Sequence, residues 1–412
     1  MTTDEKNPRT TGEAPAASPE PSTPGDAANP ACTDAATPAA PTAPAASAEE
    51  AARAREDAAR KTLAHRAGAF QTRRRSVALK AIVSVAVLLV LFVISLGVGR
   101  TSIPPQTVLE ILGNRLFGMQ GTFTAGQATI VIDIRLPRIV AAMLVGSALA
   151  VSGAAYQGLF KNPMVSPDIL GASAGASFGA ALSLLLNASN RIVQLAAFVM
   201  GFVAVMITYF SSKRVGRGTN MTLLLVLCGL IVGTLFQAFV SLIKYVADPD
   251  SKLPEITYWL MGSIAKVTWD NLKVFMIPYL LGIVPLLLLR WRLNTLAFGD
   301  AEAESLGVNV SLLRGVLIVC STLLTSAVVA IAGVVGWVGL IIPHIVRFIT
   351  GPDNRIVVPL SLVFGAIFLV LVDTCCRTLM ASEIPLGILT SVIGAPFFFV
   401  ILLRTQRGGG SE

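Results

Sequence analysis

The side chains that could carry chemistry in this sequence are few, and they form no catalytic pattern. The only two histidines are His65 and His344, and neither belongs to an HExxH zinc motif. The dipeptide Gly-Lys never occurs, so a phosphate-binding loop of the GxxxxGK[ST] type is excluded. We therefore predict no catalytic residue, no metal site and no cofactor. If the protein uses ATP, a separate chain must hydrolyse it.

Charged groups inside the apolar segments are equally few. Asp373 and Arg377 lie four residues apart, a spacing that lets them pair on one helix face. An ion-coupled secondary transporter usually needs carboxylates deep in its bundle, and no convincing set is present. That class stays open as the alternative to ATP-driven transport.

Composition places most of the chain in a membrane. Of its 412 residues, 54% are hydrophobic and 14% charged, whereas a soluble domain has about 25% charged residues. The net charge of +8 is gathered at the ends of apolar runs, as membrane orientation requires, and not in a nucleic-acid-binding patch. The five cysteines form no CxxC pair and indicate no disulfide framework.

Apolar runs predict an all-α, polytopic bundle of about ten transmembrane helices. Arg73, Arg74 and Arg75 precede the first run, which places the N-terminus in the cytoplasm by the positive-inside rule, and an even number of spans returns the C-terminus there. The expected spans are 77–99, 138–158, 170–188, 192–211, 222–246, 272–290, 312–332, 333–349, 356–376 and 386–403.

One apolar stretch is too long for a single span. Leu312 to Val346 holds 35 residues, which would reach about 52 Å as one helix, against a hydrocarbon core of about 30 Å. Gly333, Gly336 and Gly339 near its middle allow a turn. We therefore expect two helices, a division that also keeps the arginines that follow on the cytoplasmic side.

The first 75 residues differ from the rest. They are rich in Pro and Ala and poor in large apolar side chains, so we expect a disordered cytoplasmic tail. Within it, residues 48–70 have charges spaced to form a short helix. The membrane domain then covers 76–407.

Two connecting segments carry polar residues. Lys161 to Asp168 contains two prolines and reads either as a structural corner or as part of the inner mouth of a pathway. The loop from Arg292 to Val310 predicts a short helix with acidic residues in its first turns and a glycine near its end.

Several motifs, in one order along the chain, resemble the FecCD-type permeases of ABC importers. They begin with Arg135-Leu-Pro-Arg138 ahead of a span that runs AxxLVGxALAxSGAxxQG. The others are Asn162-Pro163, Pro167-Asp168-Ile-Leu-Gly171, Tyr258-Trp259-Leu-Met-Gly262-Ser263, Gly339-Leu-Ile-Ile-Pro343-His344-Ile-Val-Arg347, Glu383-Ile-Pro385-Leu-Gly387 and Gly394-Ala-Pro396-Phe397. The resemblance covers about residues 77 to 407.

The resemblance implies a set of partners and sites. The partners would be a second permease subunit, two ATP-binding cassette subunits in the cytoplasm and a substrate-binding protein outside. An ATPase-coupling loop is implied at Gly299, Asp300, Ala301, Glu302, Glu304, Ser305, Leu306 and Gly307. Arginines that dock the binding protein are implied at Arg135, Arg138 and Arg377.

A pathway and a cargo complete the expectation. Gln237, Ser241 and Lys244 are predicted to line the path from the fifth span. The resemblance implies an iron(III)–siderophore or similar chelate as cargo, with haem or cobalamin carried by the same machinery as alternatives, and a multi-pass protein of the inner, cytoplasmic membrane.

Overall fold

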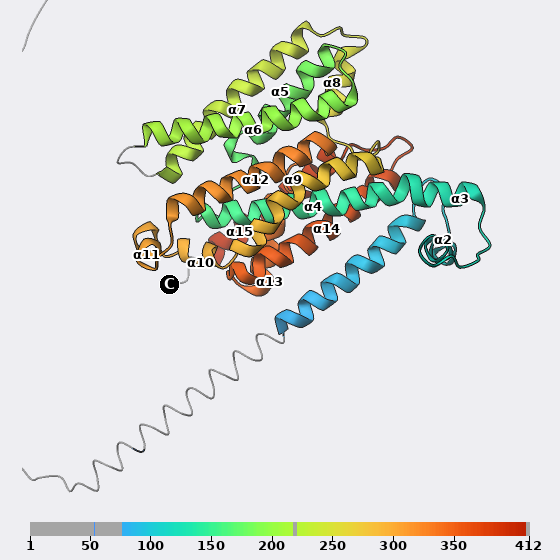
Figure 1. Cartoon of the computed structure of the whole chain (residues 1–412), viewed down its shortest axis with the longest axis horizontal. Helices are drawn as coiled ribbons and strands as arrows, with labels where there is room; N and C mark the ends of the chain where they lie inside the picture. The colour runs from blue at the N-terminus through green and yellow to red at the C-terminus, as the bar shows by residue number, and fades with distance from the viewer. Residues whose placement is uncertain (1–52, 54–75, 217–220, 409–412) are drawn as a thin grey trace, which may run out of the picture. The chain divides into compact units, whose positions relative to one another are not determined.

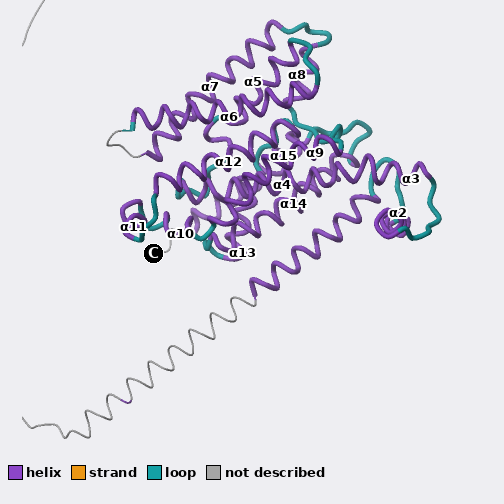
Figure 2. Tube along the Cα trace, in the orientation of Figure 1, coloured by secondary structure: helices purple, strands orange, loops and turns teal. Residues whose placement is uncertain are grey.

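The computed structural model describes residues 53, 76–216 and 221–408, and within them it contains helices and loops but no strand (Figure 2). The expected tail and its charged helix at 48–70 lie outside the described residues, apart from Arg53, which is helical and exposed.

The described chain folds into helices of very different lengths. The long ones are Ser76–Gly97, α4 (Leu136–Leu159), α6 (Asn190–Val215), α7 (Met221–Val246), α9 (Trp269–Leu289), α12 (Val310–Ala332), α14 (Asn354–Thr378) and α15 (Leu386–Gly408). The shorter ones are α2 (Pro105–Phe117), α3 (Ala125–Thr129), the π-helical η1 (Ile130–Arg135), the 3-10 helix η2 (Pro167–Leu170), α5 (Ala172–Leu185), α8 (Lys252–Leu260), α10 (Arg292–Leu296), α11 (Asp300–Ser305) and α13 (Val338–Thr350).

α4 is the centre of the bundle. It packs along α14, α12 and α13, and α5 packs between α6 and α7 in a neighbouring group (Figure 1). In the apolar 18-residue stretch of the helix Ala125–Leu159, which contains α4, 83% is buried. In the corresponding stretch of Ser76–Gly97, only 11% is buried. The first helix therefore leaves most of its surface for lipid or a partner, while α4 organises the interior.

Small residues let α4 approach its neighbours closely. A Cβ added to Gly146 would overlap the carbonyl oxygen of Gly365 in α14, and a Cβ on Gly365 would overlap that of Gly146. In lipid the contact energy comes from such close backbone packing, because no hydrophobic force draws one apolar helix to another.

The second span begins earlier than the expected residue 138. The chain is helical from Ala125 to Leu159, with the π-helical turn η1 between α3 and α4. Pro137 follows that turn, and a proline in an ordinary α-helix clashes with the carbonyl four residues before it. The residue four before Pro137 is Asp133, which lies in η1, so the wider π turn accommodates the proline and the helix continues through it.

The division of 312–346 into two helices is confirmed. α12 ends at Ala332, Gly333 follows with a φ of 66°, and α13 starts at Val338. A side chain at Gly333 would also meet the backbone oxygen of Trp259, so both the turn and the close approach need glycine.

Seven helices of the described chain are long and apolar enough to cross a membrane. Three shorter apolar helices, Ala172–Leu185, Val338–Thr350 and Leu386–Val400, coincide with the other three expected spans. The structure is thus a polytopic helical bundle, and the crossing of all ten segments stays a prediction.

Candidate functional site

One end of the bundle carries a short protruding helix where the sequence predicted a coupling loop. α11 runs from Asp300 to Ser305, and Gly299 and Gly307, both at positive φ, flank it. Of the eight predicted coupling residues, seven are exposed, and Gly299 is half-buried. The adjoining apolar side chains of Phe298 and Leu306 are 73% and 64% exposed. This end, the α11 end, therefore presents an acidic and apolar surface.

The protruding segment is tied to two long helices. Asp300 forms an ion pair with Arg314 of α12 at 2.9 Å, and Ala303, also in α11, is fully buried. Asn294 of α10 donates to the Asp353 carboxylate at 2.7 Å and accepts from the backbone N–H of Asn354 at 2.9 Å. A push on α11 would therefore be transmitted to α12 and α14.

A buried amide holds the corner that follows α4. Gln157 donates to the carbonyl oxygens of Val165, Gly339 and Leu340 at 3.1–3.3 Å, and its own oxygen accepts from Arg347 of α13. These bonds join the loop 161–168 to α13. Both residues lay in recognised motifs, but their pairing could not be read from the sequence.

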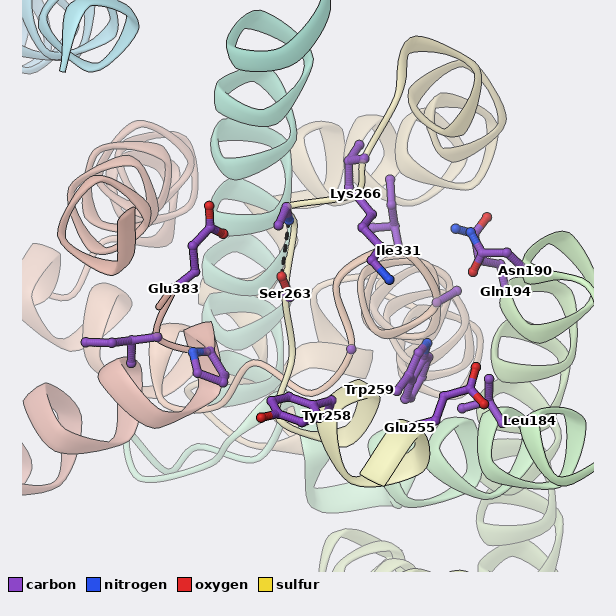
Figure 3. Close-up of a pocket in the computed structure, with 16 residues that line it drawn as sticks. Leu184, Asn190, Gln194, Glu255, Tyr258, Trp259, Ser263, Lys266, Ile331 and Glu383 are labelled. Atoms are coloured by element: carbon purple, nitrogen blue, oxygen red, sulfur yellow. Dashed lines mark hydrogen bonds between the residues drawn. The ribbon is translucent and has the colours of Figure 1, made fainter. Parts of the chain in front are cut away.

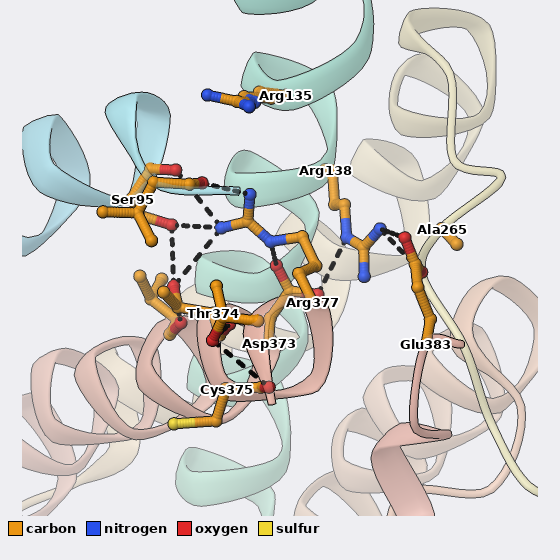
Figure 4. Close-up of polar contacts among 12 residues, drawn as sticks. Ser95, Arg135, Arg138, Ala265, Asp373, Thr374, Cys375, Arg377 and Glu383 are labelled. Carbon is orange, nitrogen blue, oxygen red and sulfur yellow. Dashed lines mark hydrogen bonds and ion pairs between the residues drawn. The ribbon is translucent and has the colours of Figure 1, made fainter. Parts of the chain in front are cut away.

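The opposite end, the α8 end, holds a cluster of buried ion pairs (Figure 4). Arg138 of α4 donates to Asp373 of α14 at 2.8 Å and to both oxygens of Glu383 at 2.9–3.0 Å. Arg377 pairs with Asp373 at 3.1 Å, which confirms the predicted pairing on one face of that helix. Asp373 thus lies between two guanidinium groups.

Two arginines cap the end of the first helix. Arg135 donates to the carbonyl oxygens of Leu96, at 2.6 Å, and Gly97, at 3.0 Å. Arg377 donates to the carbonyl oxygens of Ser95, at 3.2 Å, and Val98, at 3.0 Å. The last carbonyls of a helix lack partners within it, and cations are favoured there.

These contacts bury the three arginines expected to dock the binding protein, and their docking role stays a prediction. We expected Arg135, Arg138 and Arg377 to face a partner, but they are only 6–7% exposed. Their guanidinium groups are occupied by carbonyls of the first helix and by Asp373 and Glu383, and of these only the Arg377–Asp373 pair was predicted from spacing. The most accessible member of the cluster is Glu383, whose side chain is 35% exposed.

A pocket of about 470 Å³ opens beside this cluster (Figure 3). Figure 3 shows Glu383 and Gln194 on opposite sides of it, with the rings of Tyr258 and Trp259 between them on a third side. Its other polar lining residues are Asn190, Glu255, Ser263 and Lys266. The pocket gathers residues from α5, α6, α8, α12 and the loops that follow α8, α12 and α14, so no single stretch of sequence predicts it.

The three predicted pathway residues share a face of α7. Gln237 and Ser241 are exposed and Lys244 is half-buried. Among the residues that the structure describes, no group of three or more His, Cys, Asp or Glu side chains is placed to hold a metal ion.

Comparisons with known proteins agree on one family. Residues 87–404 match the FecCD transport family. The molybdate import system permease protein MolB of Haemophilus influenzae is 39% identical over 325 residues, which cover 79% of this chain and 95% of that protein. A probable iron chelatin transport system permease protein of Helicobacter pylori is 38% identical over 277 residues, or 67% of this chain and 83% of that one.

A solved structure is similar over the same region. It is a metal-chelate type ABC transporter in an inward-facing conformation, with 37% identity and a TM-score of 0.70, covering 78% of this chain and 98% of that one. The relatives are named for different cargo, so similarity alone does not select a cargo.

Proposed function

The chain belongs to the FecCD transport family and is a permease subunit of an ABC importer, and on this premise we propose that it carries an iron(III)–siderophore or similar metal chelate into the cytoplasm. Haem and cobalamin are the alternatives within the same machinery. They differ in cargo and not in mechanism.

The observation that carries ATP-driven transport is α11, whereas the chelate cargo is proposed from the iron chelatin relative and the metal-chelate type structure. A short helix that projects acidic and apolar side chains, and is tied to α12 and α14 by Asp300–Arg314 and Asn294–Asp353, suits the transfer of motion from an ATPase. Closure of the ATPase on binding ATP would move α11 and, through these contacts, the helices that border the path. The α11 end would then be cytoplasmic and the α8 end extracytoplasmic.

The partners follow from this arrangement. Two ATP-binding cassette subunits would meet two permease subunits in the inner membrane, this chain through α11, and a substrate-binding protein would meet the α8 end. The permease pair is either a homodimer or a heterodimer. Docking through Arg138 would require a carboxylate of the binding protein to replace Glu383, because Glu383 occupies that guanidinium. Gln237, Ser241 and Lys244 would line the path between the two permease subunits.

The structure disfavours the ion-coupled alternative on a specific ground. Asp373 is the buried carboxylate of the long helices that such a mechanism would use, but it is paired with both Arg138 and Arg377. Both sides of this carboxylate are occupied by ion pairs within the chain, so it is not free to bind a coupling ion.

The test is purification of the tagged chain from its native membranes, followed by mass spectrometry of the proteins that accompany it. We expect an ATPase with the unmodified chain, and its loss when Asp300–Leu306 is replaced by a Gly-Ser linker. The double substitution Asp270→Asn and Lys273→Gln removes an exposed ion pair at the α8 end and serves as the control.

Each part of the proposal has its own contrary outcome. An ATPase retained by the linker variant would contradict the role of α11. No ATPase with the unmodified chain, under conditions that preserve other ABC complexes, would contradict the proposed function.

A further inference from the structure

The segment between α4 and α5 inserts among the helices and does not stay at the surface. η2 packs against α7, and a Cβ on Gly229 of α7 would overlap the carbonyl oxygen of Ile169. Gly229 lies eight residues (229 − 221) beyond Met221, where α7 begins, which is about 12 Å along that helix. Thr208 of α6 donates to the carbonyl oxygen of Leu170 at 3.0 Å from a similar depth.

A carboxylate lies on this inserted segment. Irregular backbone at membrane depth is tolerated where it is buried in protein or lines a water-filled cavity, and an ionisable residue there marks a functional site. Asp168 is half-buried and accepts a hydrogen bond from the hydroxyl of Ser173. It has no ion-pair partner in the described part of the chain.

The neighbouring face of α7 carries polar residues on a surface that is otherwise suited to lipid. Its exposed positions are mostly large and apolar, as Leu230, Ile231 and Leu235 are, and suit lipid. Thr234, Gln237 and Ser241 interrupt that surface and are exposed as well. Polar groups are costly against hydrocarbon, so this stripe faces water, cargo or protein.

The hydroxyl groups of the stripe present acceptors. Thr234 donates its proton to the carbonyl oxygen of Leu230 at 2.6 Å, and Ser241 donates to that of Gln237 at 3.0 Å. Their oxygen lone pairs remain available, as do those of the Asp168 carboxylate that Ser173 does not use. Among Thr234, Gln237 and Ser241, only the Gln237 amide offers donors, and the half-buried Lys244 follows on the same face, nearer the end of α7.

A hollow joins the carboxylate to the stripe. It measures about 400 Å³, and its lining includes Asp168, Gly171, Thr234 and Gln237. Lys244 is not part of this lining, so a molecule in the hollow meets the Asp168 carboxylate and several acceptors.

We propose that Asp168, with Thr234, Gln237 and Ser241, forms an acceptor wall of the transport path that selects cargo by charge. Chelates that are neutral or positive and carry N–H donors pass this wall readily, whereas anionic chelates and oxyanions are disfavoured. This inference rests on the proposed function and narrows its cargo to one class of chelate.

The test uses the complete importer, purified with its ATPase and binding protein and reconstituted in lipid vesicles. ATP-driven uptake is measured for a ferric trihydroxamate with a pendant ammonium group, a neutral ferric trihydroxamate, a ferric tricatecholate and molybdate. Asp168→Asn keeps the shape and removes the charge, and Asp270→Asn removes an exposed carboxylate far along the chain as the matched control. ATPase activity reports whether each complex is assembled.

For the unmodified importer we expect uptake of a hydroxamate chelate. Asp168→Asn should lower uptake of the ammonium chelate about tenfold, the effect of losing one hydrogen bond to a charged acceptor, and should raise uptake of the anionic probes relative to it. Asp270→Asn should change neither.

A second readout does not depend on cargo. In a chain whose native cysteines are replaced by serine, Asp168→Cys and Gln237→Cys should react with a charged, water-soluble thiol reagent, and bound cargo should slow both reactions. Leu235→Cys, at an exposed apolar position of the same helix, should react slowly.

The outcomes separate the two ideas. Uptake ratios unchanged by Asp168→Asn, or cysteines at 168 and 237 that stay unreactive, overturn the acceptor wall while chelate import stands. Preferred uptake of the tricatecholate or of molybdate by the unmodified importer also overturns it. If no chelate is imported by an assembled, ATP-hydrolysing complex, the proposed function itself fails.

Discussion

Asp373 links α4 and α14 at the α8 end, because its carboxylate pairs with an arginine of each helix. Its carboxylate is fully buried and pairs with Arg138 at 2.8 Å and Arg377 at 3.1 Å, and these arginines in turn hold Glu383 and the end of the first helix. Removing one partner of a buried ion pair is costly because it leaves uncompensated charge. Two guanidinium groups would be left facing each other here.

Asp373→Asn should therefore destabilise the protein by about 3–5 kcal/mol, seen as a lower midpoint of thermal unfolding in detergent. Asp270→Asn breaks a pair whose two side chains are both 76% exposed, and should hardly move the midpoint. Equal midpoints for the two variants would show that the cluster is not a structural clamp.

Glu383 is the exchangeable member of the same cluster. Because it contacts Arg138 from a side chain that is 35% exposed, it competes with any carboxylate of a docking partner. Glu383→Gln should strengthen binding of the substrate-binding protein a few-fold at low salt, and the gain should shrink at high salt because such pairs are screened. Surface plasmon resonance at two ionic strengths measures both effects, and weaker binding would refute the competition.

At the scale of the element, the contact of α4 with α14 depends on the absence of side chains. Gly146→Ala would push a methyl group into the backbone of Gly365 and should cost about 1–3 kcal/mol. Gly126 in α3 has open space around it, so Gly126→Ala should be neutral or slightly stabilising. Thermal midpoints of the two variants check this, and a Gly146→Ala protein as stable as the unmodified one would refute it.

Periodicity and hydropathy predicted the helices well where one helix spans one apolar run. The expected fifth span, 222–246, differs from α7 by one residue, and the break after Ala332 was predicted from length and glycines. The second span was expected to start at residue 138, but the helix starts at Ala125 and continues through Pro137 by way of the π turn η1, a backbone feature that hydropathy does not reveal.

The site was predictable where one segment holds it and not where several meet. The exposed α11 lies within ten consecutive residues that already showed an acidic, glycine-bounded pattern. The burial of Arg135 depends on the carbonyls of Leu96 and Gly97, about 40 residues away, and the depth of Asp168 depends on α7. Residue spacing in the sequence does not predict such long-range contacts.

At the scale of the whole molecule, short helices raise a question of length. α5 has 14 residues and would reach only about 21 Å, less than a hydrocarbon core of about 30 Å. The inserted η2 segment precedes it and is shielded by α6 and α7, so the two together can complete a crossing without exposing backbone to lipid. A span of this kind fits ten crossings with both termini on one side.

This topology predicts opposite accessibility for the two ends of that segment. In a chain without its native cysteines, Asn187→Cys should react with a membrane-impermeant thiol reagent added to intact cells, and Lys161→Cys only after the membrane is permeabilised. Both residues are exposed and lie in loops, so a lack of reaction would not come from burial. Leu306→Cys in the α11 loop should behave as Lys161→Cys does, since both belong to the end assigned to the cytoplasm. If positions 161 and 187 were labelled from the same side, the segment would be a hairpin that enters and leaves the membrane on one face, the ten-span count would fall, and the acceptor wall at Asp168 would lose its place on a path through the membrane.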